Sequence, residues 1–144
     1  MIDVTASETI LAPREEVARY VMDHRNDAAW IGGIKESELL GDAPFGAGSD
    51  VRRVASFLGK RIEYVNRVDE LEPGRRLVMR SVKSPFPMVV TYSFEGEADG
   101  STRASVQVQG EPSAIYAIAG PVLWRQVHRS VSRDLRTLRR LLQR

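Results

Sequence analysis

The chain has 144 residues, of which 42% are hydrophobic and 28% charged, proportions that exclude a disordered or fibrous protein and fit one globular domain. It contains no cysteine, which excludes disulfides and thiolate catalysis and favours a reducing compartment. No stretch approaches the ~18 consecutive apolar residues of a membrane span, and the first residues lack the basic start and apolar run of a secretory signal. We therefore expect a single cytoplasmic domain over residues 1–144.

The net charge of +2 is unevenly distributed. Residues 121–144 hold seven arginines and one acid, Asp134, so this segment carries +6 and the other 120 residues carry −4. Such asymmetry can mark an anionic partner. We favour a simpler interpretation, in which the arginines form the solvated face of a helix that is attracted to an acidic sheet.

The first elements in chain order are a strand and two short helices. Residues 2–11 alternate between apolar and polar side chains, which predicts the strand. Pro13, followed by two acids and apolar residues at helical spacing, predicts a helix start. This helix should end near residues 23–25, and residues 26–30 could form one further helical turn.

From residue 34 to residue 110 the apolar period changes to two, which predicts strands. The intervening turns contain the Gly, Pro and Asp residues that tight reversals need, as in Glu72-Pro73-Gly74. Short loops join antiparallel neighbours. The segment is therefore expected to be an antiparallel meander with strands at about 34–41, 49–57, 60–71, 76–83, 88–97 and 102–110.

The last segment has the pattern of a long amphipathic helix. At ~100° of rotation per residue its large apolar side chains share one arc and its arginines the opposite arc, so the helix should cover the apolar face of the sheet. Asp134 lies inside the apolar arc and needs a partner there. We expect an ion pair with a sheet arginine such as Arg53, or a hydrogen bond with an edge backbone group; the functional alternative is a polar anchor inside the pocket. The apolar arc comprises Leu123, Trp124, Val127, Val131, Leu135, Leu138, Leu141 and Leu142.

Several short motifs, in their order and spacing, resemble the SRPBCC (START-like) superfamily, specifically its polyketide cyclase/dehydrase and lipid-transport branch. They include Ala12-Pro13 at the first helix, Gly46-x-Gly48-Ser49, Glu72-Pro73-Gly74 and Asp134-Leu135-x-x-Leu138 in the last helix. The resemblance implies an α+β helix-grip fold, in which a curved antiparallel sheet of about seven strands wraps around the C-terminal helix. It also implies an apolar cavity between sheet and helix.

The residues on the inward parity of the strands, with neighbours from the helices, are the candidate cavity lining. The polar members at these apolar positions, Asn66, Ser81 and the hydroxyls of two tyrosines, either orient a ligand oxygen or bond to each other and to water, and the sequence leaves both accounts open. The candidate ligand-binding residues are Trp30, Ile62, Tyr64, Asn66, Met79, Ser81, Val90, Tyr92, Phe94, Trp124, Val127 and Val131.

Three functions are compatible with this pattern. The first is non-catalytic binding or carriage of a lipid, polyketide-like or other apolar molecule. The second is a cyclase or dehydratase that uses Tyr64, Tyr92 or His128 as acid–base groups, although we prefer to see His128 as a half-buried structural residue. The third is an interaction module whose arginine-rich helix contacts anionic lipid or RNA.

The expected partner is therefore an apolar small molecule, with no cofactor. A metal site is disfavoured because the chain has two histidines and no cysteine. Nucleic acid is disfavoured because the other face of the arginine-rich helix must be buried, and transient membrane contact is a further alternative. Both a monomer and a homodimer are compatible with the sequence.

Overall fold

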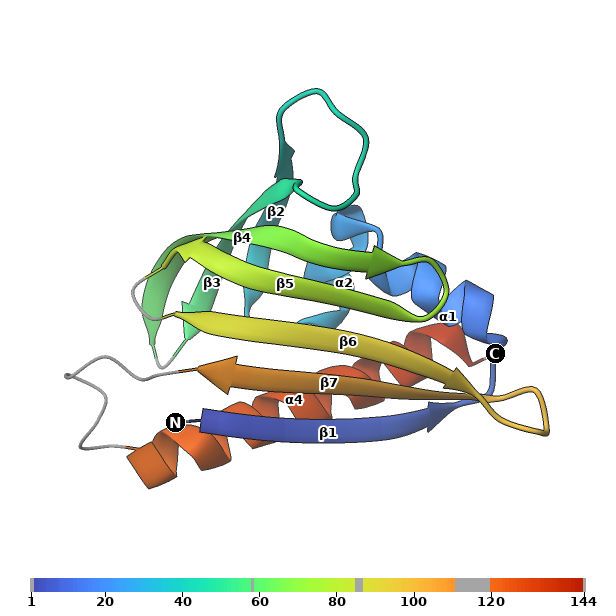
Figure 1. Cartoon of the computed structure of the whole chain (residues 1–144). Coiled ribbons are helices and arrows are strands. Elements are labelled where there is room, and N and C mark those ends of the chain that lie inside the picture. Colours follow the sequence, from blue (N-terminus) through green and yellow to red (C-terminus); the bar gives the residue numbers. More distant parts are fainter. Residues whose placement is uncertain (1, 58, 85–86, 111–119, 144) are drawn as a thin grey trace.

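A computed structural model describes residues 2–57, 59–84, 87–110 and 120–143. One long helix and seven strands make up most of the fold, with short helices between the first two strands (Figure 1). In chain order the elements are β1 (Ile2–Ile10), α1 (Arg14–Val21), the 3-10 turn η1 (His24–Asn26), α2 (Asp27–Trp30), β2 (Ile34–Leu40), β3 (Asp50–Phe57), β4 (Lys60–Glu72), β5 (Arg76–Lys83), β6 (Met88–Gly96), β7 (Thr102–Gly110) and α4 (Gly120–Leu142).

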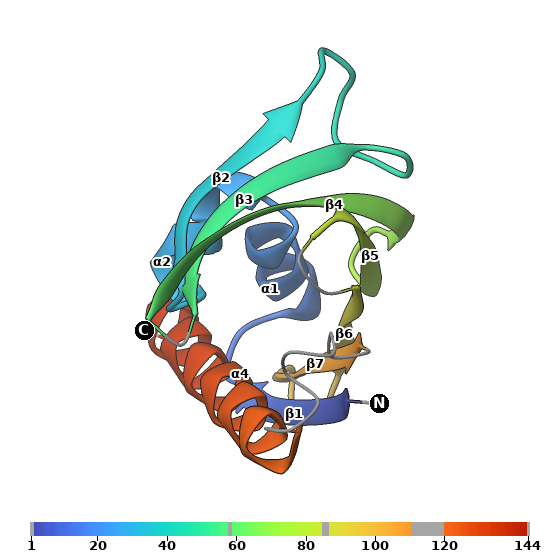
Figure 2. The same cartoon turned by 90° about the vertical axis from the view of Figure 1, so that its left-hand side faces the viewer.

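The seven strands form one antiparallel sheet in the order β1-β7-β6-β5-β4-β3-β2. Strand β1 therefore pairs with the last strand, and the remaining strands follow as a meander. Viewed from its end, the sheet curves into an arch, and α4 crosses the opening between the β1 edge and the β2–β3 edge (Figure 2). This arrangement confirms the predicted helix-grip fold.

The predicted strands agree with the observed ones to within a residue at either end. The turn glycines explain this precision, because Gly74 and Gly100 have φ of 78° and 86°, a region that side-chain-bearing residues rarely adopt. Pro13 immediately precedes α1, rather than occupying its first position as predicted. For residues 113–119 the sequence allows either a short helical turn or a kinked lead-in to the last helix, and this segment lies outside the described residues.

The inner face of the arch forms the core together with α1 and one side of α4. Leu135 and Leu138 of α4 are buried to 1% and 0% exposure and belong to the same apolar cluster as the inner strand residues and Val17 of α1. The prediction was wrong for Trp124 and Leu141, which are 45% and 41% exposed. Trp124 belongs to the first two turns of α4, and the first turns of this helix extend beyond the start of β1 (Figure 1).

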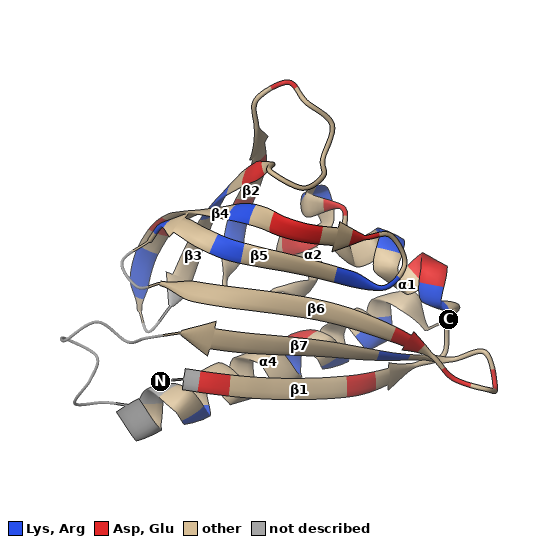
Figure 3. Cartoon of the chain, in the orientation of Figure 1, with Lys and Arg blue, Asp and Glu red and all other residues tan. Residues whose placement is uncertain are grey.

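Every arginine of α4 whose exposure the structure describes faces solvent, as predicted. Basic positions recur along the helix (Figure 3). Arg139 donates to Glu8 of β1 across 2.7 Å, which is one instance of the expected attraction between the helix and the sheet. A partly exposed pair of this kind contributes up to about 1 kcal/mol, so the helix is held mainly by its buried leucines.

Candidate functional site

A buried ion pair lies inside the arch, between α2 and β3. Arg53 donates from Nε and Nη2 to Oδ2 of Asp27 at 3.2 and 2.9 Å, and Ser37 donates to the same oxygen at 2.7 Å. The two charged residues are 5% and 1% exposed. Arg53 faces inward because it shares the parity of Val51 and Ala55 in β3, and α2 brings Asp27 over this strand.

Two candidate catalytic residues, Tyr64 and Tyr92, lie beside this ion pair. Tyr64 is the register partner of Arg53 in the β3–β4 ladder, and both phenols act electrostatically on the guanidinium. Burial disfavours the charge of Arg53, but the Asp27 carboxylate beside it favours that charge, and the pKa of Arg53 lies well above its ordinary value. Burial also raises the pKa of Tyr92, against the opposing effect of Arg53, so its phenol is neutral at physiological pH.

Asn66 and Trp30 carry buried polar atoms for which the described part of the chain supplies no partner. Both polar atoms of the Asn66 amide, and Nε1 of Trp30, make no hydrogen bond within the described residues. Asn66 is 1% exposed and lies opposite Ser81 in the β4–β5 ladder. The Ser81 oxygen instead accepts from the backbone N–H of Met88 at 2.8 Å. Of the two accounts that the sequence left open, mutual hydrogen bonding of the inward polar groups therefore does not apply to Asn66.

The apolar candidates on the strands lie on the inner face, as the alternation predicted. The indole of Trp30 packs edge-on against Tyr92, with ring centroids 6.1 Å apart. Tyr64 belongs to a second, smaller cluster with Ile34 and Ala55. Of the strand candidates, Met79, Val90 and Phe94 are buried and Ile62 is half-buried.

The candidates on α4 are spread along the helix. Val131 is half-buried against the main core and Val127 is half-buried nearer the start of the helix. His128 is exposed and stacks on the exposed Trp124, with ring centroids 6.3 Å apart. The structure therefore brings Tyr64 and Tyr92 together around Arg53 but leaves His128 on the surface, and the expectation of a half-buried His128 was wrong.

Asp134 finds a partner different from the predicted arginine. Its Oδ1 accepts the backbone N–H of Gly32, in the turn between α2 and β2, at 2.9 Å. The expected ion pair with Arg53 was wrong, because Asp27 occupies that guanidinium, whereas the alternative of a backbone partner is confirmed. This hydrogen bond joins α4 to the α2–β2 turn.

Replacing Asp134 with asparagine should slightly raise stability at neutral pH. Burial raises the pKa of Asp134, against the opposing effects of the Gly32 N–H and Arg133, so the folded state disfavours the ionised carboxylate. The wild type should therefore lose stability as pH rises from the unfolded pKa through the folded one. Asparagine keeps an oxygen for Gly32 and does not titrate, so the two proteins should differ in the pH dependence of their urea midpoints between about pH 3 and 6. Identical pH profiles would contradict the prediction.

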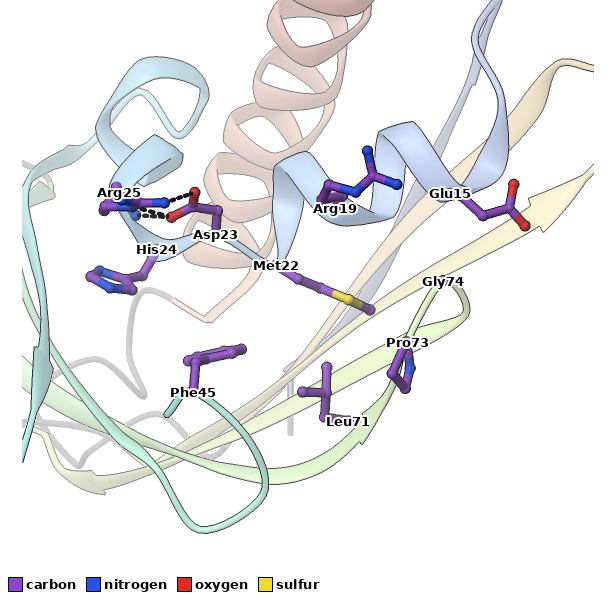
Figure 4. A pocket seen from close by; sticks show the side chains of 10 residues that line it. All are labelled: Glu15, Arg19, Met22, Asp23, His24, Arg25, Phe45, Leu71, Pro73 and Gly74. Carbon is purple, nitrogen blue, oxygen red and sulfur yellow. Dashed lines mark hydrogen bonds and ion pairs between the residues drawn. The ribbon is translucent and has the colours of Figure 1, made fainter. Parts of the chain in front are cut away.

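A surface pocket of about 800 Å³ lies at the α1 end of the arch (Figure 4). It is bounded by α1, η1, the β2–β3 loop and the β4–β5 turn, and none of the twelve predicted ligand-binding residues lines it. Its lining residues are Glu15, Arg19, Met22, Asp23, His24, Arg25, Phe45, Leu71, Pro73 and Gly74.

Sequence reasoning missed the Asp27–Arg53 pair and this pocket. The inward parity of Arg53 between Val51 and Ala55 was a usable signal, because a charge at a core position requires a partner. Phe45 was a weaker signal for the pocket: it is a large apolar side chain in a loop that otherwise contains small and polar residues, Pro and Gly. No three His, Asp or Glu side chains gather into a metal-binding group in the described ranges. Within those same ranges, no helix has the length and apolar character needed to cross a bilayer.

Comparison with known proteins gives both a family and a fold. The sequence matches the family model described as polyketide cyclase/dehydrase and lipid transport over residues 1–143. A START superfamily protein from Mycobacterium smegmatis has a TM-score of 0.86 at 16% identity, covering 99% of this chain and 97% of that chain. A protein from Thermus thermophilus has a TM-score of 0.84 at 22% identity, covering 97% and 96% respectively.

The aromatase/cyclase Zhui from a Streptomyces species is also similar, with a TM-score of 0.77 at 18% identity over 97% of this chain and 92% of that chain. No curated protein matches the sequence. At these identities the solved structures establish the fold alone, whereas the family match spans almost every residue. The chain belongs to the polyketide cyclase/dehydrase and lipid-transport family.

Proposed function

We propose that the protein binds an apolar small molecule between the sheet and α4, and that the amide of Asn66 holds a polar oxygen of this ligand. The observation that carries the proposal is the absence of any hydrogen-bond partner, among the described residues, for either polar atom of this buried amide. A buried group left unsatisfied costs about 1–3 kcal/mol. A bound ligand that supplies the missing hydrogen-bond partner would remove this cost, which favours binding.

The surroundings of Asn66 support a ligand that is mostly apolar. Met79 and Val90 face inward on the neighbouring strands and are buried, so polar contacts there are sparse. The Nε1 atom of Trp30 is a second buried donor without a partner in the described part of the chain. An amide both donates and accepts, so a hydroxyl or a ketone would suit it. Such oxygens on an apolar body occur in lipids and polyketides, the two ligand classes in the family description.

The proposal can be tested with two small probes that differ in one oxygen, benzylacetone and butylbenzene. The sequence contains two tryptophans, so a Trp124→Phe background leaves Trp30 as the sole fluorescent reporter of the interior. In that background, Asn66→Leu should weaken benzylacetone binding about tenfold and change butylbenzene binding less than about twofold. It should also raise the stability of the ligand-free protein by about 1 kcal/mol, because an unpaired amide is removed.

Two results would contradict the proposal. If neither probe, nor a panel of sterols and long-chain alcohols, gives saturable binding, the interior is not a ligand site. If Asn66→Leu destabilises the protein and leaves both affinities unchanged, ordered water satisfies the amide. The same panel, followed by mass spectrometry for conversion, distinguishes binding from cyclase or dehydratase chemistry, since a Tyr64→Phe/Tyr92→Phe variant should retain binding and lose any turnover.

A further inference from the structure

We infer that the pocket at the α1 end is a second ligand site, separate from the interior, and that it takes an amphipathic carboxylate with a short aliphatic or aromatic body. The pocket lies between α1 and the β4–β5 turn, and its volume of about 800 Å³ falls in the usual range for small-molecule sites. Figure 4 shows Met22, Phe45, Leu71 and Pro73 facing a common space, with the exposed Arg19 and Glu15 along α1 at its rim.

The walls of the pocket are apolar. Met22, Phe45 and Leu71 are each partly buried and pack with their inner sides against the main core, while Pro73 extends the surface to the β4–β5 turn. Three different elements support these side chains, so the walls are held in place before any ligand arrives. Apolar walls with a few polar groups are the usual composition of a small-molecule site.

The charged residues of the pocket are paired, with one exception. Arg25 donates from Nε and Nη2 to the two carboxylate oxygens of Asp23 at 2.9 and 2.8 Å. Glu15 accepts from Arg14 at 3.1 Å. Within residues 2–57, 59–84, 87–110 and 120–143, Arg19 makes neither a hydrogen bond nor an ion pair, and its charge reaches Glu15 only as a weaker long-range effect. Arg19 is exposed and lines the pocket, so its guanidinium is available at the rim to an incoming anion.

A second polar atom at the pocket has no partner in the ranges that the structure describes. His24 lines the pocket beside Phe45, with ring centroids 6.5 Å apart. Its Nδ1 atom is buried and has no hydrogen-bond partner among the described residues. Buried polar atoms are normally satisfied, and with its proton on Nδ1 this imidazole can donate to an acceptor that the described residues do not supply. A carboxylate, with two acceptor oxygens and an apolar tail, fits this combination of an unpaired arginine, an unpaired imidazole nitrogen and apolar walls.

Octanoate and 1-octanol are the matched probes, because they share the tail and differ in charge. Titration of ¹⁵N-labelled full-length protein should give saturable shifts of backbone amides at residues 15–25, 45 and 71–74. Arg19→Gln should weaken octanoate binding about tenfold and change octanol binding less than twofold. Phe45→Ala should weaken both about equally, because it removes part of the apolar wall. Arg129→Gln, which removes the same charge from the exposed face of α4, is the control and should leave both affinities unchanged.

The inference is wrong if the shifts appear only at inner-face residues of β4–β6, if no shift saturates, or if Arg19→Gln and Arg129→Gln weaken octanoate binding equally. This outcome is independent of the proposed interior site, because Asn66→Leu changes nothing in the outer pocket. Octanoate shifts at the pocket that persist in Asn66→Leu would establish two separate sites.

Discussion

Replacing Asp27 with alanine should lower the free energy of unfolding by about 3–5 kcal/mol, because it leaves the buried guanidinium of Arg53 without its carboxylate. Asp27 and Arg53 are 1% and 5% exposed, so water cannot compensate. The hydroxyl of Ser37 would lose its acceptor as well. Urea denaturation followed by circular dichroism measures the change. A total stability of about 5–15 kcal/mol is usual for a domain, so this variant should be close to the limit of folding.

A matched pair on the outer face provides the control. Arg80 donates to Asp69 at 3.1 Å, but the side chains are 48% and 37% exposed. Asp69→Ala should therefore cost less than about 1 kcal/mol. Equal effects of Asp27→Ala and Asp69→Ala would contradict the argument from burial.

The double variant Asp27→Leu/Arg53→Met separates charge from packing. An apolar pair of similar volume can replace a buried ion pair with little or no loss of stability. We expect the double variant to recover most of what Asp27→Ala loses, which a double-mutant cycle would quantify. The variant also removes the Arg53 guanidinium from beside Tyr92. Its ligand affinity would therefore show whether the ion pair contributes to binding as well as to stability.

The strands could be predicted well because two independent signals coincide. The period of two identifies inward residues such as Met79 and Val90, and the turn sequence Glu72-Pro73-Gly74 fixes where a strand must end. A shift of the strand register by one residue would turn all the inward apolar side chains of that strand toward solvent. The chemistry of the turns and the burial of one face therefore lead to the same register, and the structure agrees.

The partners of single polar residues could not be predicted in the same way. Helical rotation correctly placed Asp134 on the inner side of α4, but rotation alone does not say how far along the sheet a side chain sits, so Arg53 and the Gly32 backbone were equally plausible. Asp27 escaped attention because it lies in a helix of a single turn, which has no periodicity to interpret. The outer pocket depends on the path of the β2–β3 loop around Phe45, and a loop path is not encoded in any repeating pattern.

Truncating Leu138 to alanine should lower the free energy of unfolding by about 2–5 kcal/mol, because it opens a cavity where α4 meets the inner face of the sheet. Leu138 is 0% exposed, whereas Leu141, one turn further along α4, is 41% exposed. Leu141→Ala is therefore the matched control and should cost less than about 1 kcal/mol. Both leucines have the same helix propensity, so the difference between the two variants isolates burial from helix formation. If the two substitutions cost the same, α4 does not close the arch through this face, and the proposed interior site would lose the wall on which it depends.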